Sequence, residues 1–464
     1  MNVLVCGSTG CVGNAVVRAL RWRGHRVVEG HRPSTTTADE LLATMPVDFM
    51  IPRSPHDWAA RLREARIDAI VNCVGILIPE GKESFARIHS EGPIELFEGA
   101  RAAGVGRVVQ VSALNPGSDA SRRPADEPEY QRSKRRADEF LLASDLDAAV
   151  VRPSLIYGPG SVSARLFATL ASLPLIGLPG AGAQQVQPIH VFEVAEAIAV
   201  LVEKTGCVRG SYELGGRQAM SYRQMLAEYR DALGFGDALW LPVPTPLLRV
   251  SAWLAELVPQ KALSRDTLRM LEAGNTTERN AAGVLLGRAP ASLRDGLRVT
   301  APLPALDLRV HLAPPIEFGL RAALAFLWLY TAAISALWPN ESGAVALLAS
   351  CGFSGDAGVA ALVFSCLLNS ALGVATLLRP SPTLYALQLA TVGGYTLTAA
   401  INVPLLTLDH CGPLAKNLLV AAVVGVLWLA TASTPRRRPR GSADPLPSLG
   451  PSLLQVLPAE PRMS

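Results

Sequence analysis

Short apolar runs alternate with amphipathic stretches of helical length through the first part of the chain. Segments such as Gly13–Arg23 and Pro93–Ala103 have the apolar spacing of helices. Strand, helix and strand in alternation predict right-handed crossovers and a doubly wound parallel sheet with helices on both faces. The predicted buried strands are Met1–Cys6, Arg26–Val28, Asp68–Cys73, Arg107–Val111 and Asp147–Val151.

The alternation loosens after residue 158, where helices such as Val191–Lys204 and Ser221–Leu233 outnumber short strands. We therefore predict a core at residues 1–158 and a smaller substrate lobe at residues 159–297, which would close over whatever the sheet binds. Residues 298–315 are rich in proline and leucine without a clear period, and this composition predicts a linker.

Four long apolar segments follow the linker. Each has about the 20 residues that cross roughly 30 Å of hydrocarbon, and charged residues occur only near their ends. A buried soluble helical bundle is the alternative, but four consecutive uncharged segments disfavour it. We therefore predict an all-α, four-helix transmembrane domain at residues 316–434. Its predicted spans are Leu320–Trp338, Ala357–Leu378, Leu384–Leu406 and Leu414–Ala432.

Charges in the connections set the predicted orientation of these spans. The connections on one side contain Glu341, Asp356 and Asp409. The positive-inside rule then places both termini in the cytoplasm, in a bacterial-type cytoplasmic membrane. The basic, proline-rich tail at residues 435–464 is predicted to be disordered. The arginines on the cytoplasmic side are Arg321, Arg379, Arg436, Arg437, Arg438 and Arg440.

Composition narrows the classes of function. The 464 residues carry a net charge of +4, with 49% hydrophobic and 18% charged residues, and no basic stripe indicates nucleic acid. The mean hydropathy of +0.27 reflects the apolar residues after Pro315. The seven cysteines include no CxxC pair, which excludes a zinc ribbon, and no metal site is predicted. Cys351 and Cys411 fall in loops placed outside the cytoplasm, where they either form a disulfide or stay unpaired.

A glycine-rich turn lies directly between the first predicted strand and the first predicted helix, with the pattern GxxGxxG. In this context the glycines let the backbone approach a pyrophosphate, while the helix N-terminus supplies unpaired N–H groups. The turn therefore predicts a dinucleotide site. Its predicted contacts are Gly7, Thr9, Gly10, Cys11, Val12 and Gly13.

The ends of the next strands predict the rest of the cofactor site. No acid follows Glu29 where a ribose-binding carboxylate is expected, and Arg32 suits a 2′-phosphate. This favours NADP(H), with NAD(H) as the alternative if Arg32 is only solvated. A further strand, the third in chain order, is predicted to end at Asp48 and Phe49, where a carboxylate and an apolar wall would fit adenine; Asp68–Cys73 is then the fourth strand and Arg107–Val111 the fifth. The predicted contacts after the fourth strand are Cys73, Val74 and Gly75.

Tyr130 and Lys134 lie four residues apart, on one face of a predicted helix. An ammonium beneath a phenol lowers the pKa of the phenol, so we predict that Tyr130 is a general acid or base. Ser112, at the C-terminal end of the fifth strand, is the predicted donor to the substrate oxygen. An isolated Tyr-x-x-x-Lys pair is more often a solvated helix face. Here it follows the glycine turn and the strand-end serine in chain order, which favours catalysis.

These motifs, with segments 111–114 and 152–159, resemble the atypical or extended short-chain dehydrogenase/reductase superfamily over about residues 1–296. The similarity is greatest to the branch related to the NAD(P)-binding accessory subunit of respiratory complex I. The resemblance implies a Rossmann domain with Tyr130 as catalytic acid/base and Lys134 holding the ribose hydroxyls.

The same resemblance implies that Ser112 polarises a carbonyl and that residues from Pro153 to Ile156 line the nicotinamide. Two features depart from the family pattern. The interval from Ser112 to Tyr130 is short and filled by the polar stretch Gly117–Glu129, and His89 stands where many members carry a helix asparagine. Members of this branch can also bind the cofactor without turnover.

The membrane part resembles a DoxX-like four-helix domain over about residues 316–432, judged by the sequence Asp409–Asn417 before the last span. This family implies an integral membrane module sometimes tied to quinone or thiol redox work. Asp409, His410 and Lys416 at a span entrance either serve a headgroup or proton path or anchor the helix at the interface.

Together these features predict a membrane-anchored NADP(H)-dependent oxidoreductase. Hydride would pass to or from a carbonyl or hydroxyl carbon of a small, lipophilic substrate, because a water-soluble metabolite needs no bilayer anchor. Two alternatives remain at this point. One is a non-catalytic NADP(H)-binding assembly factor or redox sensor, and the other is a nucleotide-sugar epimerase or dehydratase.

Overall fold

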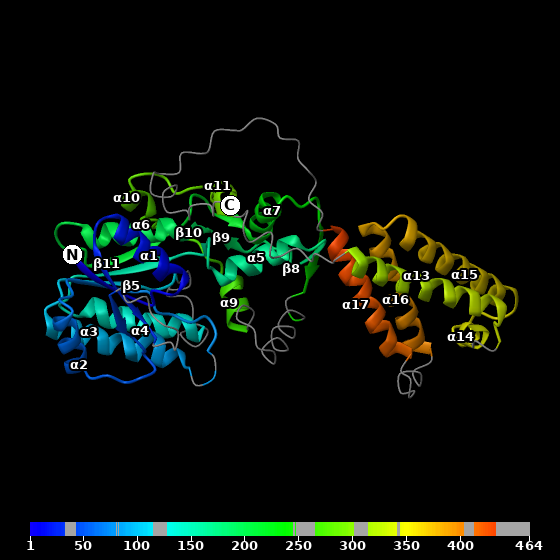
Figure 1. The fold of residues 1–464 in the computed structure, drawn as a ribbon, viewed down its shortest axis with the longest axis horizontal. Coiled ribbons are helices and arrows are strands. Elements are labelled where there is room, and N and C mark those ends of the chain that lie inside the picture. The colour runs from blue at the N-terminus through cyan, green and yellow to red at the C-terminus, as the bar shows by residue number, and fades with distance from the viewer. Residues whose placement is uncertain are drawn as a thin grey trace.

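The computed structural model describes residues 1–32, 43–79, 81, 83–114, 128–244, 246, 265–300, 314–340, 344–402 and 413–432. It confirms an α/β domain followed by a helical region, and Figure 1 shows the two at opposite ends of the molecule. The tail at residues 435–464 and most of the polar stretch Gly117–Glu129 lie outside the described residues.

A parallel seven-stranded sheet forms the centre of the α/β domain, in the order β11-β6-β5-β4-β1-β2-β3. The order reverses between β1 and β4, and ligands of such sheets bind at the carboxyl ends of the strands beside this switch point. The predicted doubly wound parallel sheet is therefore confirmed. Its strands are β1 (Asn2–Cys6), β2 (Arg26–His31), β3 (Thr44–Pro46), β4 (Ala69–Asn72), β5 (Arg107–Val111), β6 (Ala148–Pro153) and β11 (Gly210–Leu214).

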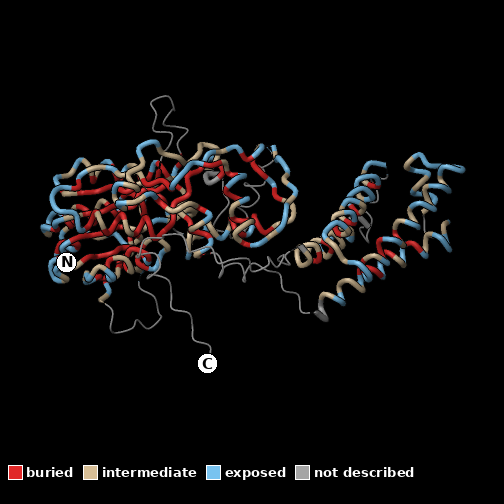
Figure 2. Tube along the Cα trace, turned by 90° about the horizontal axis from the view of Figure 1, so that it is seen from above, coloured by how far each residue is buried: buried red, intermediate tan, exposed pale blue. Residues whose placement is uncertain are grey.

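Side chains alternate between the two faces of the sheet, and each face has its own apolar core. Val3, Val71 and Val109 pack against α1 (Cys11–Trp22) and α6 (Val191–Glu203). Figure 2 shows the buried residues in the interior of this part of the molecule, with exposed residues around them. The other face is covered by the helices α2 (Pro55–Glu64), α3 (Gly92–Ala103) and α4 (Glu129–Ala143). The π-helical segment η1 (Ala86–Glu91) leads directly into α3.

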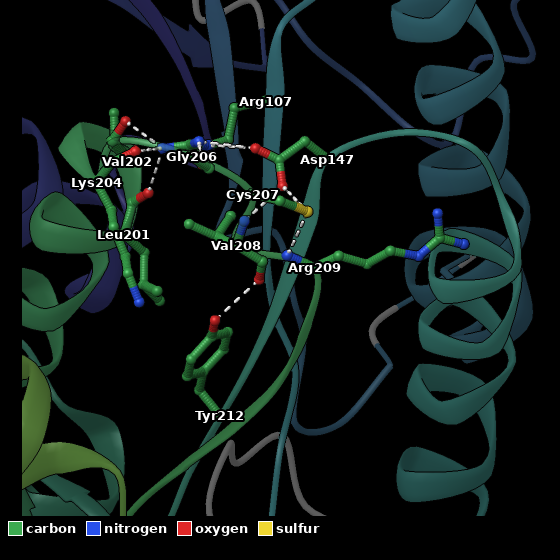
Figure 3. Close-up of polar contacts among 10 residues, drawn as sticks. All are labelled: Arg107, Asp147, Leu201, Val202, Lys204, Gly206, Cys207, Val208, Arg209 and Tyr212. Carbon is green, nitrogen blue, oxygen red and sulfur yellow. Dashed lines mark hydrogen bonds and ion pairs between the residues drawn. The ribbon is translucent and has the colours of Figure 1, made fainter.

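Arg107 on β5 ties the sheet to the C-terminal end of α6, as Figure 3 shows. Its guanidinium pairs with Asp147 at 2.7 Å. The last carbonyls of a helix lack intrahelical partners, so an arginine that reaches them stabilises the helix end. The carbonyls that accept from Arg107 are those of Leu201, Val202, Lys204 and Gly206.

The smaller lobe is built mainly from residues after β6, around a separate apolar core that includes Ile176, Met225 and Leu297. Although α6 and β11 come from the same stretch of sequence, they return to the large sheet. The strands of the lobe pair as β7 (Ile156–Tyr157) with β10 (Ile189–His190), β8 (Leu175–Pro179) with β13 (Leu239–Val243), and β9 (Gln185–Val186) with β12 (Met220–Ser221). The helices of the lobe are α5 (Val162–Ser172), α7 (Tyr222–Ala232), α9 (Arg265–Ala273) and α11 (Leu293–Thr300), whereas α10 (Ala282–Leu286) packs with α6 on the large sheet.

The C-terminal region contains three described helices that are long and apolar enough to cross a membrane: Glu317–Leu337, Gly355–Leu378 and Pro382–Asn402. The fourth predicted span forms a helix whose described apolar stretch, Lys416–Thr431, is shorter. Residues 403–406 of the third predicted span lie outside the described residues. The helices are α13 (Pro314–Leu337), the unpredicted α14 (Ala344–Ser350), α15 (Gly355–Leu378), α16 (Pro382–Asn402) and α17 (Pro413–Ala432).

Two polar side chains bond across helices in this region. Arg321 at the start of α13 donates to the carbonyl of Leu377 at 2.6 Å, so this end of α13 lies beside the end of α15. Gln388 donates to the hydroxyl of Thr376 at 2.6 Å. Such bonds add to packing in holding apolar helices together where the hydrophobic effect gives little driving force. Cys351 follows α14, whereas Asp409, His410 and Cys411 lie outside the described residues.

Candidate functional site

The glycine turn after β1 has the close backbone packing that the sequence predicts. Gly7 has a φ of +76° and its N–H donates to the carbonyl of Gly30 at 2.7 Å. A Cβ on Gly13 would lie 2.0 Å from the carbonyl oxygen of Gly7. No side chain fits there, so the first turn of α1 packs directly on the strand end.

The N-terminus of α1 is open to a ligand. Gly10 is the N-cap, and in the described chain no side chain caps it and no acid occupies the first turn. Thr9 and Gly10 are exposed, while Cys11 and Val12 are half-buried. Free N–H groups and the positive end of the helix dipole suit a pyrophosphate. These residues therefore fit a dinucleotide cofactor.

Cys11 also connects the glycine turn to the loop after β7. Its thiol donates to the carbonyl of Pro159 at 3.2 Å, and Gly160 lies against it. Burial raises the pKa of the Cys11 thiol to about 11, so it stays protonated and unreactive at neutral pH. Its contacts place it in the packing between the turn and the loop rather than in redox chemistry.

The end of β2 carries the residues predicted to read the ribose. Arg32 is exposed and forms an ion pair with Glu83 at 2.7 Å. The neighbouring His31 has a buried Nδ1 with no hydrogen-bond partner among the described residues. An unmet polar atom beside a strand end is consistent with a ligand hydroxyl or phosphate there.

Asp48 and Phe49 are only partly placed as expected. Asp48 is half-buried after β3, and its carboxylate accepts from the backbone N–H of Met50 at 2.9 Å. Phe49 is 4% exposed and packs into the core against Trp58 and Gly92. The prediction that its ring forms an adenine wall is therefore wrong, because the ring points into the core under α3.

Lys134 brings together the ends of β4 and β5. Its Nζ donates to the carbonyl of Val111 at 3.1 Å, and a Cβ on Gly75 would lie 3.1 Å from the same Nζ. Tyr130 lies one turn earlier on α4, with its ring centroid 5.8 Å from this ammonium. Phenol, ammonium and Gly75 therefore meet at the carboxyl edge of the sheet. Cys73 and Val74 connect β4 to Gly75 and are half-buried.

The pKa of Tyr130 differs from the expectation. Burial, assisted by the negative charge of Asp138, raises the pKa of the phenol to about 12. The prediction that Lys134 lowers this pKa is therefore wrong. Burial lowers the pKa of Lys134 to about 8, against the opposing effects of Asp138 and Cys73. At neutral pH both groups are protonated.

Ser112 is buried at the end of β5, and its hydroxyl is bonded within the protein. Its hydroxyl donates to the carboxylate of Asp138 at 2.7 Å, and Arg152 donates to the same carboxylate at 3.2 Å. The predicted role of polarising a substrate carbonyl is therefore not supported, because its proton is already used. Asp138 is a site residue that the sequence reasoning missed. The sequence pattern that could have revealed Asp138 is the polar residue at every fourth position along α4, namely Tyr130, Lys134 and Asp138.

His89 is a neutral, structural histidine. Its Nε2 accepts from the backbone N–H of Ile76 at 3.0 Å, so the proton lies on Nδ1, which contacts the hydroxyl of Ser133 at 3.0 Å. Burial and the charge of Lys134 lower the pKa of His89 to about 2. Its ring meets that of Tyr130 edge to face at 5.3 Å. His89 therefore fixes the phenol ring by packing.

The residues expected to line the nicotinamide lie at the end of β6 and at the start of β7. Pro153 is buried, and its carbonyl accepts from the backbone N–H of Leu114 at 3.1 Å. Ile156 is half-buried at the start of β7. Both belong to the carboxyl edge of the sheet, where the glycine turn and Tyr130 also lie.

Comparison with known proteins identifies both parts of the chain. Residues 3–215 match the NAD dependent epimerase/dehydratase family, and residues 325–425 match the DoxX-like family. A Streptomyces 3-diazoavenalumate denitrifying reductase is 30% identical over 265 residues, which are 52% of this chain and 84% of that protein. The chain belongs to the NAD dependent epimerase/dehydratase family. The predicted short-chain dehydrogenase/reductase-like domain with a NAD(P)-binding Rossmann fold and a DoxX-like C-terminal domain is thus confirmed.

Two further relatives of this epimerase/dehydratase chain extend the comparison. Ceramide reductase of Caulobacter vibrioides is 30% identical over 204 residues, covering 43% of this chain and 59% of that protein. The mitochondrial NADH-ubiquinone oxidoreductase 40 kDa subunit of Neurospora crassa is 24% identical over 217 residues, covering 46% and 55%. The chain therefore spans little more than half of these two relatives. The similarity to complex I subunits is confirmed.

Proposed function

We propose that this chain is a membrane-anchored, NADP(H)-dependent reductase that reduces a carbonyl carbon of a lipophilic substrate. The observation that carries the proposal is the meeting of Tyr130, Lys134 and Gly75 at the carboxyl edge of the sheet, beside an uncapped helix N-terminus. The bound nicotinamide would supply the hydride. The side chains of this chain would donate the proton and stabilise the charge that develops.

Tyr130 suits the proton donor of a reduction. A phenol with a pKa of about 12 is protonated at neutral pH, so it can give a proton to the alkoxide formed from a carbonyl. The same phenol is a poor base for oxidising an alcohol. Lys134, with its ammonium held by the carbonyl of Val111, stabilises the negative charge left on the phenolate.

A lipophilic substrate is supported by two features of the chain. One relative is named as a ceramide reductase, and ceramide is a lipid. The DoxX-like region places apolar helices on the same chain as the reductase domain. A bilayer anchor keeps the site close to molecules dissolved in the membrane, which raises their effective concentration at the site.

Substitution of Tyr130 tests the proposal. The full-length chain in nanodiscs is supplied with NADPH and a panel of long-chain ketones, and NADPH oxidation is followed. Tyr130→Phe should lower kcat by about 100-fold or more while the Kd for NADPH changes little. Tyr330→Phe, which removes an exposed hydroxyl from α13, is the matched control and should leave kcat unchanged. Equal rates for Tyr130→Phe and wild type would refute the proposal.

The NADP(H) preference is proposed from Arg32. A 2′-phosphate would compete with Glu83 for this guanidinium, because the two form an ion pair. Arg32→Ala should therefore weaken NADPH binding by about tenfold or more and leave NADH binding nearly unchanged. Glu83→Gln should strengthen NADPH binding. Equal effects on both cofactors would contradict the preference.

A second candidate function is a NADP(H)-binding protein without turnover. The bond from Ser112 to Asp138 favours it, since the predicted donor to a carbonyl is then unavailable. The kinship with a complex I subunit adds to it. In the same assay this function gives tight NADPH binding and no oxidation dependent on Tyr130. A changed nucleotide sugar without net NADPH consumption would instead indicate epimerase chemistry.

A further inference from the structure

The smaller lobe has an apolar sheet face that is turned outward. Strands β8 and β13 run parallel, with Leu239 beside Leu175, Leu241 beside Gly177 and Val243 beside Pro179. Residues on alternate positions of paired strands share one face. Leu239 is 67% exposed and Leu241 is 49% exposed. The positions of this face that reach the surface are Leu175, Gly177, Leu239, Leu241 and Val243, of which Leu175 and Val243 are half-buried, whereas Pro179 at the end of β8 is buried.

The opposite face of β8 is core, whereas the opposite face of β13 carries Trp240, which is half-buried against that core, and Pro242, which is exposed. Ile176 and Leu178 are buried among the residues of the lobe. All the residues of β13 are apolar, so its outward leucines do not belong to a strand with one polar, water-facing side. A long apolar edge strand that faces water invites aggregation, and proteins usually protect such edges with charges. The described residues of β13 carry no charge.

We propose that this outward face of β8 and β13 rests in the interface of the lipid bilayer. The helix α11 packs in the lobe through Leu297, and residues 301–313 lead from it to α13. Even fully extended, that connection reaches no more than about 50 Å. The lobe is therefore confined close to the membrane into which its own chain is inserted, and Figure 1 shows the β8 end of the lobe toward α13 and α17.

A cation lies beside the strand pair. Arg223 on α7 is exposed, and its guanidinium lies 5.4 Å from the centre of the ring of Trp240, which stands between Leu239 and Leu241 on β13 and packs against the core of the lobe. Tryptophan and arginine suit the headgroup region, where an apolar body meets a charged lipid surface. Apolar area framed by a cation matches the chemistry of a phospholipid interface.

This inference rests on the proposed function in one respect only, namely the route by which a lipid substrate would reach the lobe. A bilayer-bound face on the lobe would let the substrate pass from the membrane to Tyr130 without crossing bulk water. The contact itself does not need turnover, so it is tested separately.

Photo-crosslinking of the full-length chain in nanodiscs tests the contact. Benzoylphenylalanine replaces Leu239 in one variant, Leu241 in a second and Ala60 in a control. Ala60 is exposed on α2, at the end of the molecule far from α13 in Figure 1. After irradiation, mass spectrometry counts phospholipid adducts. We expect about tenfold more adduct at positions 239 and 241 than at position 60.

Three results would overturn the contact. Equal adducts at all three positions would show that the face is in water. Cross-links to a second copy of the chain, or to another segment of the same chain, would show that protein covers the face instead.

A double variant measures the consequence for substrate. Leu239→Ser together with Leu241→Ser should slow turnover of a long-chain ketone held in the bilayer by about fivefold, with a water-soluble short-chain ketone unaffected. Equal slowing of both ketones would contradict the route. If wild type turns over neither ketone, the proposed function fails while the cross-linking result still decides the contact.

Discussion

The α/β domain and the C-terminal helices use the same apolar residue types in opposite ways. In the α/β domain the large apolar side chains lie inside, and Leu4, Ile70 and Val150 are fully buried. In the C-terminal helices many lie outside, with Phe364 66% exposed and Leu418 74% exposed. Figure 2 shows this contrast as buried strands in one part and exposed helix surfaces in the other.

The contrast shows that the solvent, and not the side chain alone, decides which surface is stable. In water, burial of apolar surface stabilises the α/β domain by roughly 25 cal/mol per Å². Hydrocarbon has no such preference, so an apolar helix face can remain outward in a bilayer. Breaking this contrast with matched substitutions gives four predictions.

The largest effect is expected from glycines. Gly13→Ala places a Cβ against the carbonyl of Gly7, so the turn must shift, and NADPH binding should weaken by about 100-fold. Gly425 in α17 has open space around its Cβ position, and Gly425→Ala should instead stabilise the helix by about 0.5–1 kcal/mol. Titration with NADPH and thermal unfolding in nanodiscs measure the two. Similar binding for wild type and Gly13→Ala would contradict the role of the turn.

A charged residue introduced at an exposed apolar position should change stability differently in water and in hydrocarbon. Val284 on α10 is 85% exposed, and Val284→Asp should change the free energy of unfolding by less than about 0.5 kcal/mol. Phe364 on α15 is 66% exposed, and Phe364→Asp should cost about 2–3 kcal/mol because the carboxylate would face hydrocarbon. Membrane insertion and thermal unfolding are the readouts. Equal, small effects would mean that α15 faces water.

Arginine caps helix ends in both parts of the molecule. Arg107→Ala should cost about 2 kcal/mol, because Asp147 and the last carbonyls of α6 lose their donor. Arg321 holds the end of α15 in the same manner, so Arg321→Ala should loosen the contact between α13 and α15. Arg135→Ala, at the exposed ion pair with Glu139, is the control and should cost about 0.3 kcal/mol. Denaturation of the three variants measures these differences.

The smallest effect is the response to pH, and it is confined to the α/β domain. The pKa of Lys134 is lowered to about 8, so its ammonium is present below that pH and is lost above it. Carbonyl reduction should therefore be nearly constant below pH 8 and fall by up to about tenfold per unit above it. Lys134→Arg keeps the charge at all these pH values, so its slower reaction should lack the break near pH 8. A break that persists in Lys134→Arg would assign it to another group.

Much of the fold was predictable from the sequence. The strands fully buried in the parallel sheet are continuous apolar runs, and the glycine turn needs only neighbouring backbone atoms to be recognised. Local pattern also found the apolar helices. The return of α6 and β11 to the large sheet was not predictable in the same way, because nothing local distinguishes a strand that joins one sheet from a strand that joins another.

The candidate site was predicted only where helix geometry brings residues together. The spacing from Tyr130 to Lys134 guarantees one face of α4. The partners from other elements were missed. Asp138 takes the proton of Ser112 because α4 packs against the end of β5, and Phe49 turns inward because Gly92 leaves room for its ring. These contacts join residues far apart along the chain, which no local period encodes.

The sequence by itself determined the parallel sheet, the glycine turn, the Tyr130–Lys134 pair and the apolar helices, since each depends on residues within a few turns or strands of one another. Only the tertiary structure decided the charge state of the site. Desolvation depends on all the groups packed around a side chain. Burial therefore raises the pKa of Tyr130, although the ammonium of Lys134 one helical turn away predicted a lower pKa. It also decided which apolar residues remain outward, because burial is a property of the assembled molecule and its solvent.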